Sequence, residues 1–149
     1  MGRVALVSDT HGLLRPEVAR ALRGTDLILH MGDVGSPEVL EDLRAIAPTR
    51  AVRGNVDHGA WARALPESDL VPLHGANLYL LHNLAELDLD PAAAGVAMVL
   101  YGHTHVPKEE EKNGVRYVNP VSIGPRRFDL PISFAFLGED LSVEFVRLG

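Results

Sequence analysis

Short apolar runs alternate with longer amphipathic stretches over the first third of the chain. The runs at residues 3–8 and 26–30 are rich in Val, Ile, Leu and Ala, as buried strands are, and residues 49–53 form a third strand-like run. The stretches 15–23 and 36–47 have helical composition, and each carries a proline suited to a first helical turn. This strand–helix–strand–helix–strand alternation predicts a parallel sheet with crossover helices.

The rest of the chain has a strand-rich pattern, from which we expect a second sheet packed on the first. An apolar run at residues 96–101 predicts one more buried strand, and Asp90-Pro91 begins a short Ala-rich helix that Gly95 breaks. The stretch 58–68, which carries the only tryptophan, is expected to be a surface loop. Turn residues between strand-like runs predict three hairpins, which pair 70–73 with 77–81, 108–112 with 115–118, and 132–137 with 141–146.

The composition fits one domain spanning residues 1–149, which is long enough to bury its own core. No cysteine is present, so disulfides, thiolate metal sites and a cysteine nucleophile are excluded. The apolar runs are too short to cross a bilayer and no signal-peptide pattern opens the chain, so we expect a cytoplasmic protein that does not bind membranes. The net charge of -6 argues against an extended nucleic-acid surface. The oligomeric state is left open, a homo-oligomer included.

Polar residues that can bind metal follow five of the predicted strands. The run 96–101 ends at Gly102, after which His103 and His105 stand two residues apart and can aim at one centre in extended chain. Taken alone, each such residue has a structural explanation, as a turn former or as a histidine bonded to backbone. Together they form a set of carboxylates, imidazoles and one amide on strand ends that converge on one edge: Asp9, His11, Asp33, Asn55, His82, His103 and His105.

This set of oxygen and nitrogen ligands is too large for one tetrahedral ion and is suited to two ions that share a bridging carboxylate. Paired metals are typical of sites that clamp the attacking and leaving oxygens of a phosphoryl group. Carboxylate and imidazole ligands without thiolate favour manganese, iron, nickel or zinc over magnesium or calcium. We therefore expect two divalent transition metal ions, with manganese foremost, and a phosphate ester as the substrate.

Motifs of a known family follow one another along the chain: Asp9-x-His11, Gly32-Asp33, Gly54-Asn55, His82, Gly102-His103-x-His105 and Asn119-Pro120-Val121-Ser122. In this order they resemble the calcineurin-like metallophosphoesterases, and the chain looks most like their small bacterial and archaeal single-domain phosphodiesterase branch. The resemblance implies an α/β fold, a four-layer αββα sandwich of two mixed sheets. It also implies a two-metal-dependent phosphodiesterase that hydrolyses a small phosphodiester by a metal-bridging hydroxide.

The resemblance also assigns the ligands to two metal positions. The first metal would take Asp9, His11, Asp33 and His105. The second metal would take Asp33, Asn55, His82 and His103. Asp33 would thus bridge the two ions.

The chain departs from the family pattern just after Asn55. Many relatives have a histidine there that protonates the leaving group, whereas this chain has Val56 followed by Asp57. His58 is the residue that could replace the missing acid, so the catalytic candidates are Asn55, Asp57 and His58. Without an acid, diesters with acidic leaving groups should react faster than alkyl diesters. His30, which lies inside a predicted strand, is expected to support the site from behind.

A protein-binding scaffold is the alternative to an enzyme. The small retromer scaffold subunit shares this fold and resembles this branch, yet it acts by binding other proteins. Loss of metal ligands would favour a weakly catalytic or non-catalytic scaffold of that kind, whereas every ligand position is filled here. Two other hydrolase patterns fail, since a metallo-β-lactamase-like site would not have Val106-Pro107 after His105, and Asp9-Thr10-His11 is not the His-x-His of an amidohydrolase.

Overall fold

The structure, a computed structural model, describes residues 3–104, 106, 108–120, 122–124 and 132–148. The first half alternates strands with helices: β1 (Val4–Val7), α1 (Pro16–Ala21), β2 (Leu27–His30), α2 (Pro37–Ile46), β3 (Thr49–Ala51) and α3 (Ala60–Arg63). Strands dominate the second half: β4 (Ser68–Leu73), β5 (Ala76–Leu81), the 3-10 helix η1 (Leu84–Glu86), β6 (Met98–Leu100), β7 (Lys108–Lys112), β8 (Val115–Asn119), β9 (Ile132–Leu137) and β10 (Val143–Leu148). None of the described helices is long and apolar enough to span a membrane.

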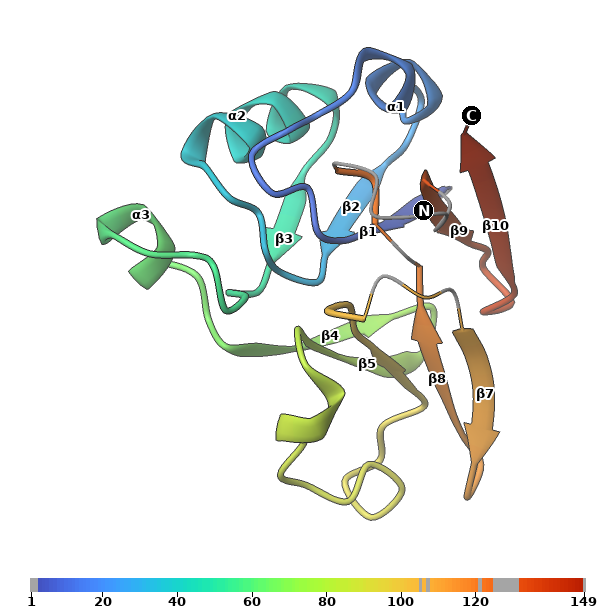
Figure 1. Ribbon diagram of the computed structural model, residues 1–149. Helices are drawn as coiled ribbons and strands as arrows, with labels where there is room; N and C mark the ends of the chain where they lie inside the picture. The colour runs from blue at the N-terminus through green and yellow to red at the C-terminus, as the bar shows by residue number, and fades with distance from the viewer. Residues whose placement is uncertain (1–2, 105, 107, 121, 125–131, 149) are drawn as a thin grey trace.

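Within the described residues the strands form two mixed five-stranded sheets (Figure 1). The first sheet has the order β10-β9-β1-β2-β3, in which β1, β2 and β3 are parallel and β9 and β10 are antiparallel additions. The second sheet has the order β4-β5-β6-β8-β7, with parallel β5, β6 and β8 between antiparallel edges. The predicted parallel strands and all three predicted hairpins are confirmed.

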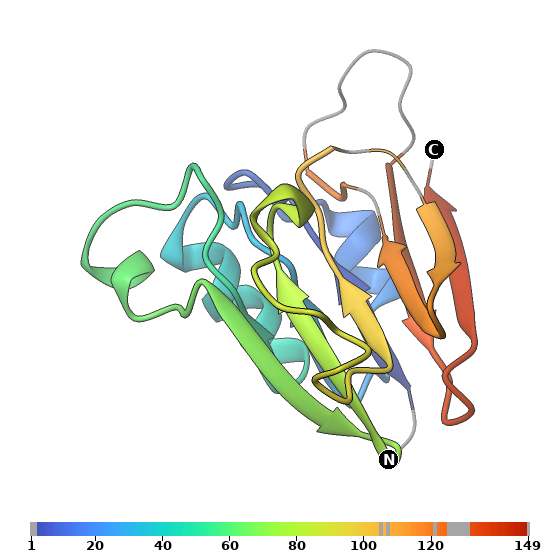
Figure 2. The same ribbon diagram turned by 90° about the horizontal axis from the view of Figure 1, so that it is seen from below.

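The two sheets pack on each other because alternate residues of each strand point to opposite faces. In β1, Ala5 and Val7 belong to the apolar cluster with the helices, whereas Val4 and Leu6 belong to the cluster between the sheets. Figures 1 and 2 show α1 and α2 over the outer face of the first sheet, with the second sheet on its other side. The predicted α/β fold with two mixed sheets is therefore confirmed.

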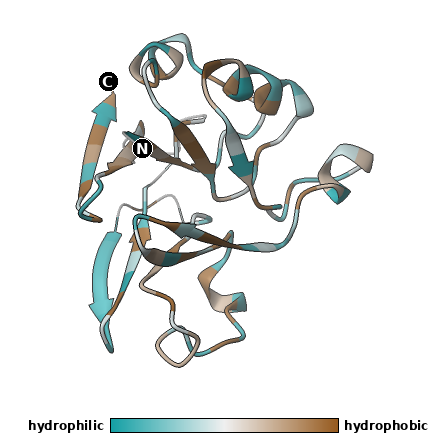
Figure 3. Cartoon of the chain, turned by 180° about the vertical axis from the view of Figure 1, so that it is seen from behind, coloured by the Kyte–Doolittle hydropathy of each residue, from teal (hydrophilic) through white to brown (hydrophobic). Residues whose placement is uncertain are grey.

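The outer face of the second sheet is covered by short segments rather than by a long helix. Val99, Tyr101 and Val115 lie in a buried cluster there, against which Leu84 of η1 packs. Residues 91–95, where the sequence predicted an Ala-rich helix, form successive turns instead. The alanines are too few to nucleate a stable helix before the backbone turns into the left-handed region at Gly95, whose φ is +76°. The edge strand β7 is charged along its whole length, as expected, and Figure 3 shows it as uniformly hydrophilic.

The connection between β3 and β4 is more ordered than the sequence suggested. Residues 58–68 were expected to form a surface loop, but they contain the one-turn helix α3, which begins after Gly59 with a φ of +95°. Trp61 packs partly buried against the cluster between the first sheet and its helices. The tryptophan therefore anchors this segment beside the carboxyl end of β3.

Candidate metal centre

The candidate ligands lie where the carboxyl ends of the two sheets meet. In the first sheet, Asp9 and His11 follow β1, Asp33 follows β2 and Asn55 follows β3. In the second sheet, His82 directly follows β5 and His103 follows β6. His105 lies outside the described residues. The sequence predicted that these strand ends converge on one edge. In the structure they belong to both sheets, and the site lies between the two sheets.

The described carboxylates and imidazoles form two groups that could each hold a metal ion. The ligand atoms of Asp9, His11 and Asp33 lie within 4.8 Å of one another, and so do those of Asp33, His82 and His103. Asp33 is common to both groups. The donor set is oxygen and nitrogen without thiolate, which suits divalent transition metals.

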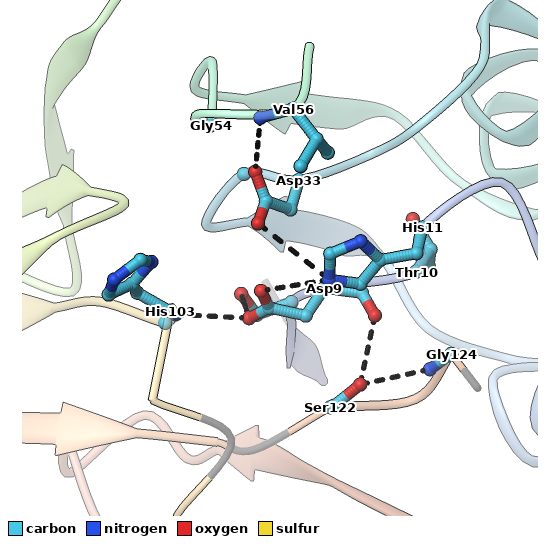
Figure 4. Close-up of polar contacts among 12 residues, drawn as sticks. Asp9, Thr10, His11, Asp33, Gly54, Val56, His103, Ser122 and Gly124 are labelled. Carbon is cyan, nitrogen blue, oxygen red and sulfur yellow. Dashed lines mark hydrogen bonds and ion pairs between the residues drawn. The ribbon is translucent and has the colours of Figure 1, made fainter. Parts of the chain in front are cut away.

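Individual distances place Asp33 at the centre of these contacts. Its Oδ2 lies 3.1 Å from Nε2 of His82 and 3.7 Å from Nε2 of His11. Oδ1 of Asp9 lies 3.5 Å from the same nitrogen of His11 and 3.9 Å from Nε2 of His82. Nδ1 of His103 lies 3.3 Å from Nε2 of His82. Figure 4 shows the side chains of Asp9, His11 and Asp33 directed toward one another, with the backbone N–H of His103 next to the Asp9 carboxylate.

Four of these residues have backbone conformations that L-amino acids rarely adopt. The φ angles are +56° at Asp9, +48° at His11, +56° at Asp33 and +74° at His103. Left-handed backbone at such residues is strained and is found mostly where the surrounding structure enforces it, often at functional sites. The sequence offered no signal of this feature, because none of the four positions is a glycine.

Close approach of backbone segments explains two of the motif glycines. A Cβ at Gly54 would lie 2.1 Å from Oδ1 of Asp33, and a Cβ at Gly102 would lie 2.6 Å from Oδ2 of Asp9. Neither position can accept a side chain without displacing a carboxylate of the site. These glycines let the loops after β3 and β6 reach the loops after β1 and β2.

Hydrogen bonds fix the orientation of both carboxylates. Oδ2 of Asp9 accepts from the Ser8 hydroxyl at 2.5 Å and from the His103 backbone N–H at 3.2 Å. Oδ1 of Asp33 accepts from the Val56 N–H at 3.0 Å. In each case one carboxylate oxygen is held by the protein and the other faces the imidazoles, an arrangement that suits a metal ligand with ordered support.

The imidazole of His82 is also oriented by a hydrogen bond, on the side of the ring that faces away from Asp33. Its Nδ1 lies 2.8 Å from the Met31 carbonyl, which can only accept, so Nδ1 carries a proton and Nε2 faces Asp33. Burial by itself lowers the pKa of His82, but the hydrogen bond to Asp33 and the nearby charge of Asp9 outweigh it and raise that pKa. Burial conversely favours a raised pKa for Asp33, but its bonds to His82 and Val56 lower that pKa. A proton on Nε2 of His82 therefore occupies the direction in which a metal would bind.

A fully buried histidine lies beneath the centre. His30 accepts from the Gly32 N–H through Nδ1 at 3.0 Å, and its Nε2 lies 3.0 Å from Oγ1 of Thr10. The Thr10 hydroxyl donates to the Val34 carbonyl at 2.8 Å, so it accepts the proton of Nε2. Burial lowers the pKa of His30 to about 4, despite the opposing charges of Asp9 and Asp57. His30 is thus neutral, as expected for a supporting residue, and joins the loops after β1 and β2.

Asp57 is buried and its carboxylate is occupied by backbone amides. Oδ1 accepts from the Gly35 N–H at 2.8 Å, while Oδ2 accepts from the Gly54 N–H at 2.8 Å and the Val34 N–H at 3.2 Å. Asp57 therefore ties the loop that carries Asp33 to the loop that carries Asn55. The sequence named it as a catalytic candidate, and that role stays a prediction, because the structure shows only that the carboxylate accepts from backbone amides.

Two cavities border Asn55 at the edge of the centre. One, of about 290 Å³, also borders His82 and Tyr79, whereas the other, of about 380 Å³, borders His58 and Arg63. His58 is exposed and reaches this second cavity but belongs to neither of the two ligand groups.

The structure thus brings Asp9, His11, Asp33, His82 and His103 together, with Asn55 beside them.

Residues from the Asn-Pro-Val-Ser segment also support the centre, a role that the sequence did not reveal. Nδ2 of Asn119 donates to the Gly102 carbonyl at 3.2 Å and to Oγ1 of Thr104 at 3.0 Å. The Ser122 hydroxyl donates to the Asp9 carbonyl at 2.9 Å (Figure 4). The only available signal was the motif itself, because the folding of this segment against the loop after β6 depends on tertiary contacts.

Comparison with known proteins supports the sequence motifs. Residues 3–140 match the family model of the calcineurin-like phosphoesterase superfamily domain. A probable metallophosphoesterase of Methanothermobacter thermautotrophicus is 32% identical over 160 residues, which cover 98% of this chain and 92% of that relative. The phosphodiesterase YfcE of Escherichia coli is 27% identical over 172 residues, which cover 95% of this chain and 90% of that relative.

Solved structures share the architecture at lower identity. An archaeal phosphodiesterase superposes with a TM-score of 0.82 at 21% identity, over 98% of this chain and 99% of that one. Zinc-bound Vps29 of Entamoeba histolytica superposes with a TM-score of 0.76 at 21% identity, over 98% of each chain. At these identities the similarity demonstrates a common fold.

Proposed function

This chain belongs to the calcineurin-like phosphoesterase superfamily, and from this premise we propose that it is a two-metal-dependent phosphodiesterase. The observation that carries the proposal is the position of Asp33, which is shared by two groups of potential metal ligands. A shared carboxylate is the feature that distinguishes a paired-metal site from two separate ones. Manganese is the metal we expect first, with iron, nickel or zinc as alternatives.

The ligand assignment follows the two groups together with the family resemblance. The first ion would be held by Asp9, His11, Asp33 and His105, and the second by Asp33, Asn55, His82 and His103. Metals bound there would supply positive charge for the phosphoryl oxygens and lower the pKa of the attacking water.

The protein itself contributes orientation. Ser8 and the His103 N–H hold one oxygen of Asp9, while the other oxygen faces the imidazoles of His11 and His82. The Val56 N–H does the same for Asp33, so both carboxylates are ordered before substrate arrives. Preorganised polar groups of this kind usually make the largest contribution to electrostatic stabilisation of the transition state.

A diester is favoured over a monoester by the two cavities that both border Asn55. A diester has two alcohol substituents, and each cavity could accept one while the phosphoryl group lies at the metals. Val56, which is 39% exposed, has no proton to donate to a leaving group, and the Asp57 carboxylate is engaged by three amides. His58 is the remaining candidate for a general acid, since it borders one of these cavities.

The test is turnover by protein reconstituted with manganese. It should hydrolyse bis(para-nitrophenyl) phosphate faster than para-nitrophenyl phosphate, and elemental analysis should approach about two metal ions per chain. Asp33→Asn should lower kcat/KM more than about 100-fold, because loss of a supporting residue alone typically costs about 10–100-fold. The matched control is Asp42→Asn on the exposed side of α2, which should keep full activity. Full activity with one metal per chain, or normal turnover by Asp33→Asn, would exclude the paired-metal proposal.

A protein-binding scaffold of the same fold is the second candidate, favoured by the structural similarity to Vps29. Under that proposal the purified protein would show no metal-dependent turnover of any phosphodiester. The cytoplasmic location, a small phosphodiester as substrate and the absence of nucleic-acid and membrane partners stay predictions of the sequence.

A further inference from the structure

The cavity of about 290 Å³ beside the candidate centre has an unusual charge distribution. It begins at Asn55 and His82 and continues between the loop after β3, strand β5 and η1. Its charged side chains away from the ligands are Arg53, Glu67, Glu86 and Asp88.

The single guanidinium of this cavity is already neutralised. Arg53 donates to Oε1 of Glu67 at 2.8 Å, which pairs one cation with one carboxylate. Glu86 and Asp88 form no ion pair with any residue in the described part of the chain. The cavity wall therefore carries two solvent-exposed carboxylates without an ion-pair partner among the described residues, next to a centre that would be positive when it holds metal.

An aromatic and apolar surface forms another part of the same wall. Tyr79 and Leu81 of β5 line the cavity, and Tyr79 is only partly buried. An aromatic face together with carboxylates is the combination that recognises a substituted ammonium group, through the ring quadrupole and through opposite charge. A carboxylate or a second phosphate would instead be repelled by Glu86 and Asp88.

We propose that this cavity binds the alcohol substituent of a phosphodiester when that substituent carries a quaternary or substituted ammonium group. Such a diester has a negative phosphoryl group and a positive charge a few bonds away, which matches a positive centre beside a negative cavity. Glu86 and Asp88 are then specificity-determining residues and Tyr79 is the ring against which the ammonium group packs. This inference rests on the proposed function for the position of the phosphoryl group.

The test compares two ligands of the same shape and different charge. Phosphocholine is compared with its neutral isostere, in which a carbon replaces the quaternary nitrogen so that the alcohol substituent is uncharged. Each is titrated by calorimetry into manganese-reconstituted protein. We expect phosphocholine to bind about 3-fold tighter or more, the size of effect typical of solvent-accessible charge pairs. The double substitution Glu86→Gln with Asp88→Asn should remove this difference while the neutral isostere binds as before. The matched control, Glu41→Gln with Asp42→Asn on exposed positions of α2, should leave the difference intact.

A second arm measures kcat/KM for the para-nitrophenyl diesters of choline and of the neutral isosteric alcohol, which share one leaving group. The same ratio should appear there and should vanish in the double variant. Equal affinity for both ligands, or a difference that survives the double substitution, would overturn the inference. If neither diester is hydrolysed the proposed function fails, while the calorimetric comparison still decides whether the cavity selects an ammonium group.

Discussion

The residues of the centre are held in costly conformations by their neighbours. Left-handed backbone costs an ordinary residue roughly 1 kcal/mol or more, and Asp9, His11, Asp33 and His103 all adopt it. Hydrogen bonds between loops compensate, such as the bond from the His11 N–H to the Asp33 carbonyl at 2.9 Å. Together with His82, these four left-handed residues make up the two groups of potential metal ligands.

Leaving-group dependence tests whether a single residue acts as general acid. A positioned acid typically contributes about 10²–10⁴-fold, and its contribution grows as the leaving group becomes more basic. Because Val56 has no proton to donate and Asp57 is engaged by amides, we expect a steep dependence of kcat/KM on leaving-group pKa across substituted phenyl diesters. His58→Ala should show the same slope as the unmodified protein. A shallow slope that steepens in His58→Ala would instead identify His58 as the acid.

Asp57→Asn separates positioning from proton donation in the same series. The amide keeps the size of the carboxylate but cannot accept three backbone N–H bonds equally well, so we expect weaker metal affinity and reduced stability with an unchanged slope. A normal metal affinity combined with a changed slope would support a catalytic role for Asp57.

At the scale of elements, the regular strands and hairpins were predictable and the irregular segments were not. The hairpin around Asn113-Gly114 forms as expected, since its turn residues adopt φ angles of +53° and +78°. Helix α3 was missed because one turn anchored by Trp61 has no periodicity to read. The turns at residues 91–95 were overpredicted as a helix because composition alone favours one there.

The ends of β1 and β2 are joined by His30, and this junction should depend on pH. The pKa of His30 is about 4 in the folded protein and close to its ordinary value of 6.5 when unfolded. The unfolded chain therefore takes up a proton as pH falls through 6.5, whereas the folded protein does so only near 4. Stability contributed by neutral His30 is thus full above pH 6.5 and declines by about 3 kcal/mol on going to pH 4.

Urea unfolding at pH 7.5 and at pH 4.5, with and without His30→Gln, measures this effect. The glutamine cannot titrate and can still donate to Thr10, so the variant should lose less stability on acidification than the unmodified protein. Equal losses in the two proteins would show that His30 does not control the junction. Titration of the His30 ring followed by NMR provides an independent measurement should the variant fold poorly.

At the scale of the whole molecule, the candidate centre connects the two sheets. Asp9, His11 and Asp33 come from the first sheet, whereas His82 and His103 come from the second. The sequence predicted these residues and the existence of two sheets, because residue type, order and hydrophobic pattern are local. Which strand ends face one another depends on how the apolar faces of the two sheets pack. Leu6 of the first sheet, for example, lies in the same buried cluster as Leu100 of the second. Such packing between distant segments cannot be read from the local sequence.

Metal binding should therefore stabilise the entire fold and not only its loops. A ligand that binds only the folded state adds about 4 kcal/mol at 1,000 times its Kd, and here it would also link the sheets across their interface. We expect manganese to raise the Tm of the unmodified protein by several degrees and a chelator to reverse the shift. Asp33→Asn should lose most of the shift, because both ions would lose a charged ligand, whereas Asp42→Asn on α2 should keep it. An equal rise in all three proteins would mean that manganese binds elsewhere, and the absence of any rise would argue that this centre does not hold metal in the folded protein.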